Sequence, residues 1–304
     1  MSKTLFLLDS GDPDEYKEIQ KIAKENNSEI WGVTTNPSLI AKSASSRTTG
    51  RITQKEAFEL QKQIVLEITG IVPGAVSAEV YADKNTKAPE MIDQGKEIST
   101  WHPRVVVKLP TTIEGFKART GLRKEGIAVN NTLVFSQEQI FAVCLHEKLM
   151  QNLNPTINES NYCFISPFVG RLDDIGIDGM MLIEHGMKIK ELFGNIPVWM
   201  LEASVRKAEH VKRGMDFGTE LITAPAKVYD EWFTMSDEQK QSLDKSYADT
   251  LSPIEYWNPP DELFSISSIE EFTQAIESKS LNIHHELTDK GLIKFAQDWQ
   301  AIIA

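Results

Sequence analysis

The stretch VVVKLPTT, at residues 105–112, joins a run of valines to a lysine and a proline. A short continuous run of β-branched residues is typical of a strand that is buried on both faces, as in a parallel sheet. Lysine is rarely buried without a partner, so its place at the end of this run needs an explanation. Alternation along a strand puts Val106 and Lys108 on one face and Val105 and Val107 on the other. We therefore expect a buried parallel strand that ends in an amine.

Seven further apolar runs alternate with helical patterns along the chain. They occupy residues 4–10, 29–35, 75–82, 126–135, 162–169, 197–204 and 219–225. Eight strand-like runs, each followed by a helical or potentially helical segment, are the pattern of a (β/α)8 barrel, the TIM barrel of the α/β class. A doubly wound open sheet is the alternative, but no glycine-rich dinucleotide loop follows any of the runs.

Local signals suggest where several helices begin. Asn36 and Pro37 have the residue types of an N-cap and a first helical position. Thr111 and Glu114 have the spacing of a capping box at the start of the helix that follows the VVVKLP strand. The polar, small-residue stretch 41–53, AKSASSRTTGRIT, is expected to be a loop.

The tail of the chain, residues 235–304, falls outside the repeat. It carries helical patterns on either side of a proline-rich stretch, PIEYWNPPDELF at 253–264, which we expect to be irregular. The aromatic residues of that stretch favour packing against the barrel. We therefore expect residues 1–304 to form a single (β/α)8 barrel domain with 235–304 as a C-terminal helical extension.

Composition restricts the class of partner. The 304 residues have a formal net charge of −12, which disfavours nucleic acid and anionic membrane surfaces as ligands because both require a basic face. The apolar stretches of the sequence are too short for a membrane span or a signal peptide. The two cysteines have no metal-ligand spacing and fit a reducing cytoplasm. An anionic small molecule remains open as a substrate because a pocket can be locally basic.

Polar side chains gather at the ends of the predicted strands, where barrel enzymes place their active sites. Any one of them could be polar simply because the chain leaves the core at that point. The candidates are Asp9, Asn36, Glu79, Lys108, Asn130, Thr132, Ser166, Arg171, Ser204 and Arg206.

Lys108 has two interpretations. It could extend its amine to the surface from a strand end, or it could hold the amine in an apolar pocket. Burial disfavours the charged form of an amine, and a neutral amine can attack a ketone to form a Schiff base. Such chemistry needs an acid or base to move protons, and Asp9 and Glu79 are carboxylates at the ends of other strands.

The remaining candidates suit a phosphorylated polyol. Amide and hydroxyl groups would orient the hydroxyl groups of the substrate. Arg171, Ser204 and Arg206 form a plausible phosphate site, with Ser204 opening a helix whose N–H groups face the anion. The alternative is an N-cap and two surface arginines. No histidine, including the pair His284 and His285, has metal-ligand spacing, so we expect no metal and no cofactor, and the pair is expected to be solvated or capping.

The ordered motifs WGVTTNPSLIAK, VSAEV, VVVKLPTTIEGFKA, EGIAVNNTLVFSQEQ, ISPFVGRLDD and EASVR resemble those of the transaldolase family, which has a class I aldolase-type Schiff-base barrel. The resemblance spans about residues 4–225 and is weaker in the C-terminal segment LTDKGLIKFAQDW. It implies transfer of a dihydroxyacetone unit from sedoheptulose 7-phosphate to glyceraldehyde 3-phosphate in the non-oxidative pentose phosphate pathway. A cytoplasmic enzyme is expected, and a homo-oligomer is compatible with the sequence.

The resemblance also implies catalytic roles for four residues. Lys108 matches the Schiff-base lysine. Asp9 matches the acid/base that takes the C4 hydroxyl proton of the sugar, and Glu79 matches the carboxylate that works with Thr132 through a catalytic water.

Substrate-binding roles follow from the same match. Asn36, Asn130 and Ser166 match groups around the dihydroxyacetone unit. The phosphate site is matched by Arg171, Ser204 and Arg206.

Two residues bear on the choice within the family. Phe168 and Glu79 stand where related fructose-6-phosphate aldolases tend to have tyrosine and glutamine, which favours transfer over simple cleavage. A fructose-6-phosphate aldolase releasing free dihydroxyacetone is the first alternative, and a sugar-phosphate-binding barrel without turnover is the second. The segment EKLMQNLNPTINESNY, at 147–162, is longer than the family usually has, and the stretch after Asn36 departs from its pattern.

Overall fold

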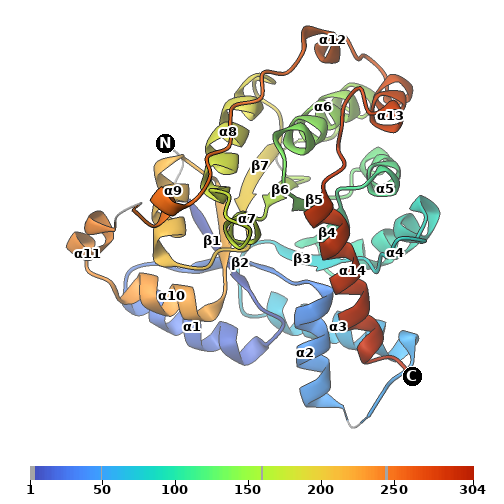
Figure 1. The fold of residues 1–304 in the computed structure, drawn as a ribbon. Coiled ribbons are helices and arrows are strands. Elements are labelled where there is room, and N and C mark those ends of the chain that lie inside the picture. The colour runs from blue at the N-terminus through green and yellow to red at the C-terminus, as the bar shows by residue number, and fades with distance from the viewer. Residues whose placement is uncertain (1–3, 49, 159, 244–245) are drawn as a thin grey trace.

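The barrel is closed and entirely parallel. The computed structural model describes residues 4–48, 50–158, 160–243 and 246–304. Each strand pairs with the next in sequence, and β8 pairs with β1 (Figure 1). The strands are β1 (Leu5–Asp9), β2 (Ile30–Thr34), β3 (Val76–Glu79), β4 (Val105–Pro110), β5 (Val129–Val134), β6 (Cys163–Pro167), β7 (Val198–Glu202) and β8 (Leu221–Ala224). The predicted (β/α)8 barrel is confirmed, with each strand somewhat shorter than or equal to its apolar run.

Helices surround the strands and cover their outer faces (Figure 1). They are α1 (Pro13–Glu25), α2 (Pro37–Arg47), α3 (Gln54–Thr69), α4 (Ala88–Ser99), α5 (Ile113–Lys124), α6 (Gln137–Leu153), α7 (Val169–Asp173), α8 (Gly179–Glu191), α9 (Ala208–Asp216) and α10 (Ala226–Thr234). None of the helices in the described part of the chain is both long and apolar enough to cross a membrane.

The two faces of β4 are as the alternation predicts. A Cβ placed on Gly95 of α4 would lie 3.1 Å from Val107 Cγ1, so Val107 points outward to the helix layer. Lys108, its neighbour in a strand, therefore points into the barrel. All six residues of β4 are buried, and Val106 shares the inner face of the strand with Lys108.

The prediction of a loop over residues 41–53 is wrong for residues 41–47, because α2 continues to Arg47. Ala41 and Ala44 are buried on the inner side of this helix. The hydroxyl of Ser45 donates to the Ala41 carbonyl at 2.9 Å, so this serine is satisfied within the helix. Small and polar residues can therefore continue a helix when a narrow face has to pack closely. Thr49, within the same expected loop, lies outside the described residues.

The expected capping box at Thr111 and Glu114 is also wrong. Thr112 is the N-cap of α5, and its side chain accepts from Gly115 N at 3.0 Å. The Thr111 hydroxyl instead donates to the Thr132 carbonyl at 2.8 Å. Glu114 accepts a hydrogen bond from Ala88 N at 2.9 Å. Both side chains are taken by neighbouring strands and helices, which a local spacing rule does not foresee.

The C-terminal extension runs around the outside of the barrel and returns across its rim. Its elements are α11 (Asp237–Ser242), the 3₁₀ helix η1 (Ser246–Thr250), α12 (Asp261–Phe264), α13 (Ile269–Ser278) and α14 (Glu286–Ala301). After α11 the chain passes α9 and α8, reaches α12 and α13, and then crosses the strand ends as α14 (Figure 1). The stretch 253–264 is irregular as far as Pro260, as predicted.

Aromatic contacts attach this extension to the helix layer. Trp257 and Phe264 pack on Phe141 of α6, with ring centroids 5.5 and 5.2 Å apart. Farther along, Phe272 packs on Phe116 of α5 at 5.2 Å. The helices of the extension thus lie against the barrel, whereas the expectation that residues 1–304 form a single domain stays a prediction.

Candidate active site

Lys108 is buried inside the barrel and does not reach the surface. Its side chain is 4% exposed, and Nζ lies 3.2 Å from Glu79 Oε2. Nζ also donates to the Thr35 carbonyl at 2.9 Å. Glu79 and Lys108 are paired in register on β3 and β4, so the sheet itself places the carboxylate beside the amine. The interpretation of a lysine that extends to solvent is therefore wrong.

Glu79 is a buried carboxyl group with an altered acidity. Burial raises its pKa to about 6, while the charge of Lys108 opposes the rise. A carboxyl group with this pKa can both accept and release a proton near neutral pH. Close by on β5, Thr132 is fully buried, and its Oγ1 has no hydrogen-bond partner among the described residues. Thr132 pairs in register with Pro110 of β4. Glu79 and Thr132 therefore lie on β3 and β5, the two strands that flank the strand of Lys108.

Asp9 lies at the end of β1 and lines the same cavity as Lys108. Its Oδ1 accepts a hydrogen bond from Thr34 Oγ1 at 2.7 Å. Thr34 Oγ1 also lies 2.6 Å from Thr223 Oγ1, so Thr223 can donate to Thr34 while Thr34 donates to Asp9. Burial raises the pKa of Asp9, and the charge of Lys108 and the bond from Thr34 oppose the rise. The hydroxyl chain fixes one oxygen of a carboxyl group whose proton affinity is increased.

Amide and hydroxyl groups continue around the barrel interior. Ser166 Oγ donates to Asn130 Oδ1 at 2.6 Å, and Asn130 Nδ2 donates to Ser77 Oγ at 3.1 Å. This chain fixes the orientation of the buried Asn130 amide. Asn36 is the N-cap of α2, as predicted, and its Oδ1 accepts from Leu39 N at 3.0 Å. Its amide nitrogen is left as the donor for a ligand.

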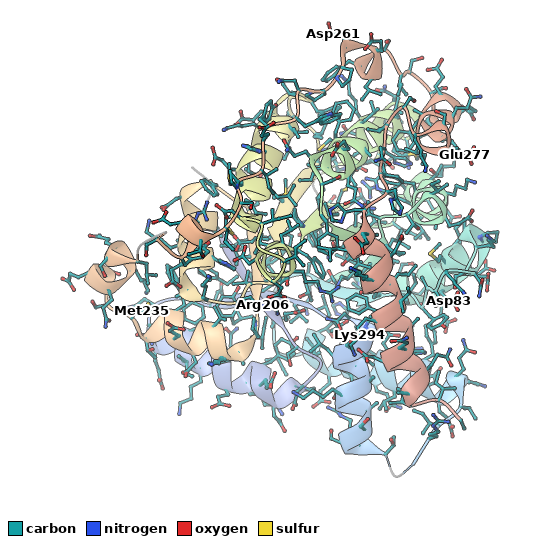
Figure 2. All side chains as sticks on the ribbon, in the orientation of Figure 1. Asp83, Arg206, Met235, Asp261, Glu277 and Lys294 are labelled. Carbon is teal, nitrogen blue, oxygen red and sulfur yellow. The ribbon has the colours of Figure 1, made fainter. Side chains whose placement is uncertain are left out.

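The cationic side of the cavity consists of Arg171, Ser204 and Arg206. Arg171 lies on α7, and Arg206 pairs with Asp174 at 3.2 Å while remaining exposed at the rim, where Figure 2 labels it. The expectation that Ser204 opens a helix is wrong, because α9 begins at Ala208. Ser204 has a φ of 59°, in the left-handed region, and its carbonyl accepts from Gly170 N at 3.1 Å. The chain after β7 is therefore held against α7 before it turns into the helix.

These side chains enclose a cavity of about 100 Å³. Its lining consists of Asp9, Thr34, Asn36, Lys108, Ser166, Phe168, Arg171, Leu201, Ala203, Ser204, Arg206, Thr223 and Phe295. Eight of the eleven predicted site residues are in this lining, and the other three, Glu79, Asn130 and Thr132, lie on β3 and β5 on either side of the lysine strand. The residues predicted from their places at strand ends thus come from most of the strands of the barrel and lie around one cavity or beside it.

Five lining residues are not among the predicted site residues: Thr34, Leu201, Ala203, Thr223 and Phe295. Thr223, at the end of β8, carries the same signal as the predicted residues, a polar residue where a barrel strand ends. Phe295 lies on α14 in the C-terminal extension and has no local signal, because an aromatic residue on an amphipathic helix is usually part of the core.

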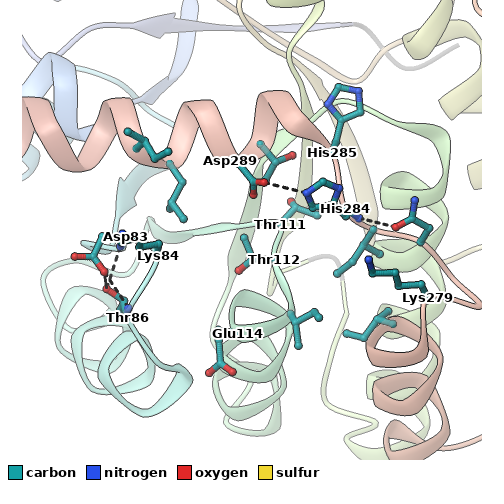
Figure 3. Close-up of a pocket in the computed structure, with 17 residues that line it drawn as sticks. Asp83, Lys84, Thr86, Thr111, Thr112, Glu114, Lys279, His284, His285 and Asp289 are labelled. Atoms are coloured by element: carbon teal, nitrogen blue, oxygen red, sulfur yellow. Dashed lines mark hydrogen bonds and ion pairs between the residues drawn. The ribbon is translucent and has the colours of Figure 1, made fainter.

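A larger cavity of about 490 Å³ lies on another side of α14 (Figure 3). It is bordered by the loops after β3 and β4 and by α13, and it contains neither Lys108 nor Asp9. In it, His284 Nε2 lies 2.9 Å from Asp289 Oδ2. His285 accepts from Leu287 N and so caps α14, which confirms the predicted capping role for one histidine of the pair. Size alone would select this cavity, but the buried amine of Lys108 and the carboxyl group of Asp9, whose pKa burial raises, line the smaller one.

Among residues 4–48, 50–158, 160–243 and 246–304, no group of three or more His, Cys, Asp or Glu side chains is placed so that it could hold a metal ion.

Comparison with known proteins identifies the family. The family model for transaldolase and fructose-6-phosphate aldolase matches residues 6–304. A probable transaldolase of Desulforudis audaxviator (strain MP104C) is 37% identical over 223 residues, which cover 73% of this chain and 86% of the relative. Probable transaldolase 1 of Listeria monocytogenes serotype 4b (strain F2365) is 36% identical over 226 residues, covering 74% and 88%.

A longer alignment includes the C-terminal extension. A probable transaldolase of Alkaliphilus metalliredigens (strain QYMF) is 30% identical over 298 residues, which cover 98% of this chain and 99% of the relative. The closed parallel barrel, the side chains that converge on Lys108 and these matches agree with one another. The chain belongs to the transaldolase/fructose-6-phosphate aldolase family.

Proposed function

We propose that this protein is a transaldolase of the cytoplasm, acting in the non-oxidative pentose phosphate pathway. It transfers a dihydroxyacetone unit from sedoheptulose 7-phosphate to glyceraldehyde 3-phosphate, giving erythrose 4-phosphate and fructose 6-phosphate. The observation that carries the proposal is the buried pair of Lys108 and Glu79, at 3.2 Å, in which Lys108 lines the same cavity as Asp9. The family match and the named relatives support the same reaction class.

The first step forms the Schiff base. After its proton passes to Glu79, the amine of Lys108 attacks the C2 carbonyl of the donor, and the carbinolamine loses its hydroxyl group as water to give an iminium ion. Glu79 moves the protons in this step, through a water that it holds together with the Thr132 hydroxyl. A pKa of about 6 for Glu79 suits both directions of that transfer.

The second step breaks and remakes a carbon–carbon bond. Asp9 removes the proton of the C4 hydroxyl, the C3–C4 bond breaks, and its electron pair passes to the iminium ion to form an enamine. Erythrose 4-phosphate leaves as the aldehyde. The enamine then attacks the aldehyde carbon of glyceraldehyde 3-phosphate, Asp9 returns the proton to the new alkoxide, and hydrolysis of the imine releases fructose 6-phosphate.

The remaining site residues bind the substrate. Asn36, Asn130 and Ser166 hold the hydroxyl groups of the dihydroxyacetone unit. Arg171 and Arg206, with the Ser204 hydroxyl, bind the phosphate group at the opposite end of the sugar, and Phe168 forms the apolar side of this region. Lys108, Glu79 and Asp9 provide the chemistry without a metal or an organic cofactor.

Activity is expected to depend on the acceptor aldehyde. Fructose 6-phosphate supplied with erythrose 4-phosphate should yield sedoheptulose 7-phosphate and glyceraldehyde 3-phosphate, because the enamine remains attached to Lys108 until it attacks an acceptor aldehyde. Chromatography of the products, with and without the acceptor, measures this. Release of free dihydroxyacetone at the same rate without acceptor would make the protein an aldolase. Tight binding of fructose 6-phosphate with no product in either case would make it a binding protein.

The acidic limb of the pH profile should report Glu79. Burial raises its pKa to about 6, so the carboxylate is lost as the pH falls through that value. If the ionised form acts as the base, kcat/KM falls by about tenfold for each pH unit below it. In Glu79→Gln the inflection near pH 6 should disappear from a much reduced rate. An unchanged inflection in that variant would assign the limb to another group.

A further inference from the structure

The guanidinium of Arg171 lies close to two phenylalanine rings. Its Cζ is 5.1 Å from the ring centroid of Phe168, at the end of β6, and 5.4 Å from that of Phe295 on α14. Both distances are within the range of about 6 Å over which a cation is attracted to an aromatic ring. Phe295 is 4% exposed and lines the active-site cavity. The C-terminal extension thus contributes a side chain to the site.

Arg171 differs from the other arginines near it in having no acidic partner. Arg206 pairs with Asp174 at 3.2 Å and Arg213 pairs with Asp178 at 2.9 Å. For Arg171, no ion pair or hydrogen bond to any residue in the described ranges is present. A partly buried guanidinium positioned by rings rather than by a carboxylate keeps its N–H groups for an incoming anion.

Contacts with β5, α2 and α7 hold α14 in place across the rim of the barrel. Thr288 Oγ1 donates to the carbonyl of Leu133 at 2.9 Å, and Leu133 has a φ of 59° directly after Thr132. At the other end of the helix, the Ser38 hydroxyl donates to Asp298. Between them, a Cβ on Gly291 would lie 2.8 Å from Arg171 Nη1, so a glycine permits the close approach. The position of Phe295 is therefore determined by both ends of its helix.

We propose that Phe295 is a positioning residue for Arg171, and that α14 is a wall of the phosphate-binding end of the active site. The inference rests on the proposed function in so far as the anion is a sugar phosphate. Phe295 limits the positions that the guanidinium can take and keeps it directed into the cavity. Without the ring, the arginine gains freedom of movement and can reach water, so phosphate binding weakens while the Lys108 chemistry is retained.

Two substitutions at Phe295 distinguish the effect of the aromatic face from the effect of the volume that the side chain fills. Phe295→Leu keeps an apolar side chain but removes the aromatic face, whereas Phe295→Tyr keeps the face. The matched control is Ile293→Ala, which shortens an apolar residue of the same helix that lines the larger cavity instead. Titration calorimetry with inorganic phosphate is the first readout, because it does not depend on turnover.

We expect Phe295→Leu to raise the dissociation constant of phosphate by about tenfold. Phe295→Tyr and Ile293→Ala should bind phosphate as the wild type does. In kinetics, Phe295→Leu should raise KM for fructose 6-phosphate more than it lowers kcat, and should leave KM for the unphosphorylated donor fructose nearly unchanged. Rescue by tyrosine distinguishes an aromatic contact from a merely filled wall.

Three results would overturn the inference. They are wild-type phosphate affinity in Phe295→Leu, an equal loss in Phe295→Tyr, and no binding of phosphate by the wild type. The proposed function fails separately, if the wild type turns over no sugar phosphate. In that event the phosphate titrations still decide whether Phe295 positions Arg171.

Discussion

Replacing Lys108 with alanine is expected to lower kcat by roughly 10⁴–10⁶-fold, the range seen when a covalent nucleophile or its close partner is removed. The amine is the only proposed group that forms a bond to the substrate, and neither Glu79 nor Asp9 can replace it as an electron sink. Steady-state assay of dihydroxyacetone transfer measures the loss. Circular dichroism should show a folded barrel, because Glu79, whose pKa burial already raises to about 6, can take up a proton when its cationic partner is removed.

Lys108→Arg is the matched control for charge. A guanidinium keeps the positive charge beside Glu79, which the wild type has at 3.2 Å. It stays protonated at neutral pH and does not form a stable imine with a ketone. We therefore expect Lys108→Arg to be as inactive as Lys108→Ala. Retention of a substantial part of the wild-type rate by either variant would contradict covalent catalysis at this position.

The largest loss of stability is expected at Glu147, far from the chemistry. Glu147 on α6 is fully buried and pairs with two fully buried arginines of α5, Arg119 and Arg123. Arg119 Nη2 lies 2.5 Å from Glu147 Oε2. Removing one member of a buried ion network leaves uncompensated charge, which costs about 3–5 kcal/mol. Glu147→Ala should therefore lower the free energy of unfolding by that amount.

Urea denaturation measures this loss, and Glu184→Ala is its control. Glu184 pairs with Lys188 at 2.7 Å on the surface of α8. Loss of an exposed pair typically costs about 0–1 kcal/mol. Comparable losses in the two variants would show that the buried network does not stabilise the helix layer.

Glu147→Ala is also expected to lower activity, though by less than Lys108→Ala does. Arg119, a partner of Glu147, donates from Nε to Asn131 Oδ1 at 3.0 Å, and Asn131 lies between Asn130 and Thr132 on β5.

Alternation and strand-end position together explain how the centre of the site could be predicted. Period-two alternation places Lys108 on the inner face of β4, and a parallel barrel brings every strand end to one rim. Asp9, Glu79 and Thr132 follow from the same rule. Their hydrogen-bond partners do not, because the Thr34–Thr223 contact depends on the closure between β1, β2 and β8.

The wrong and missed predictions share a physical cause. Ser204 looked like an N-cap, but its carbonyl is bound to α7 and its helix begins later. Thr111 looked like a capping residue, but its hydroxyl bonds to β5. Phe295 reaches the cavity only because the extension circles the barrel and returns (Figure 1). In each case a long-range contact overrides or adds to a pattern that is read within a few residues.

Trapping of the intermediate at Lys108 tests the central claim most directly. Borohydride reduces an iminium ion to a stable amine, so wild-type protein treated with fructose 6-phosphate and borohydride should gain a permanent mass on the peptide that contains Lys108. Lys108→Ala, treated in the same way, should gain none. Peptide mass spectrometry of the wild type without a label, or of Lys108→Ala with an equal label, would contradict the account.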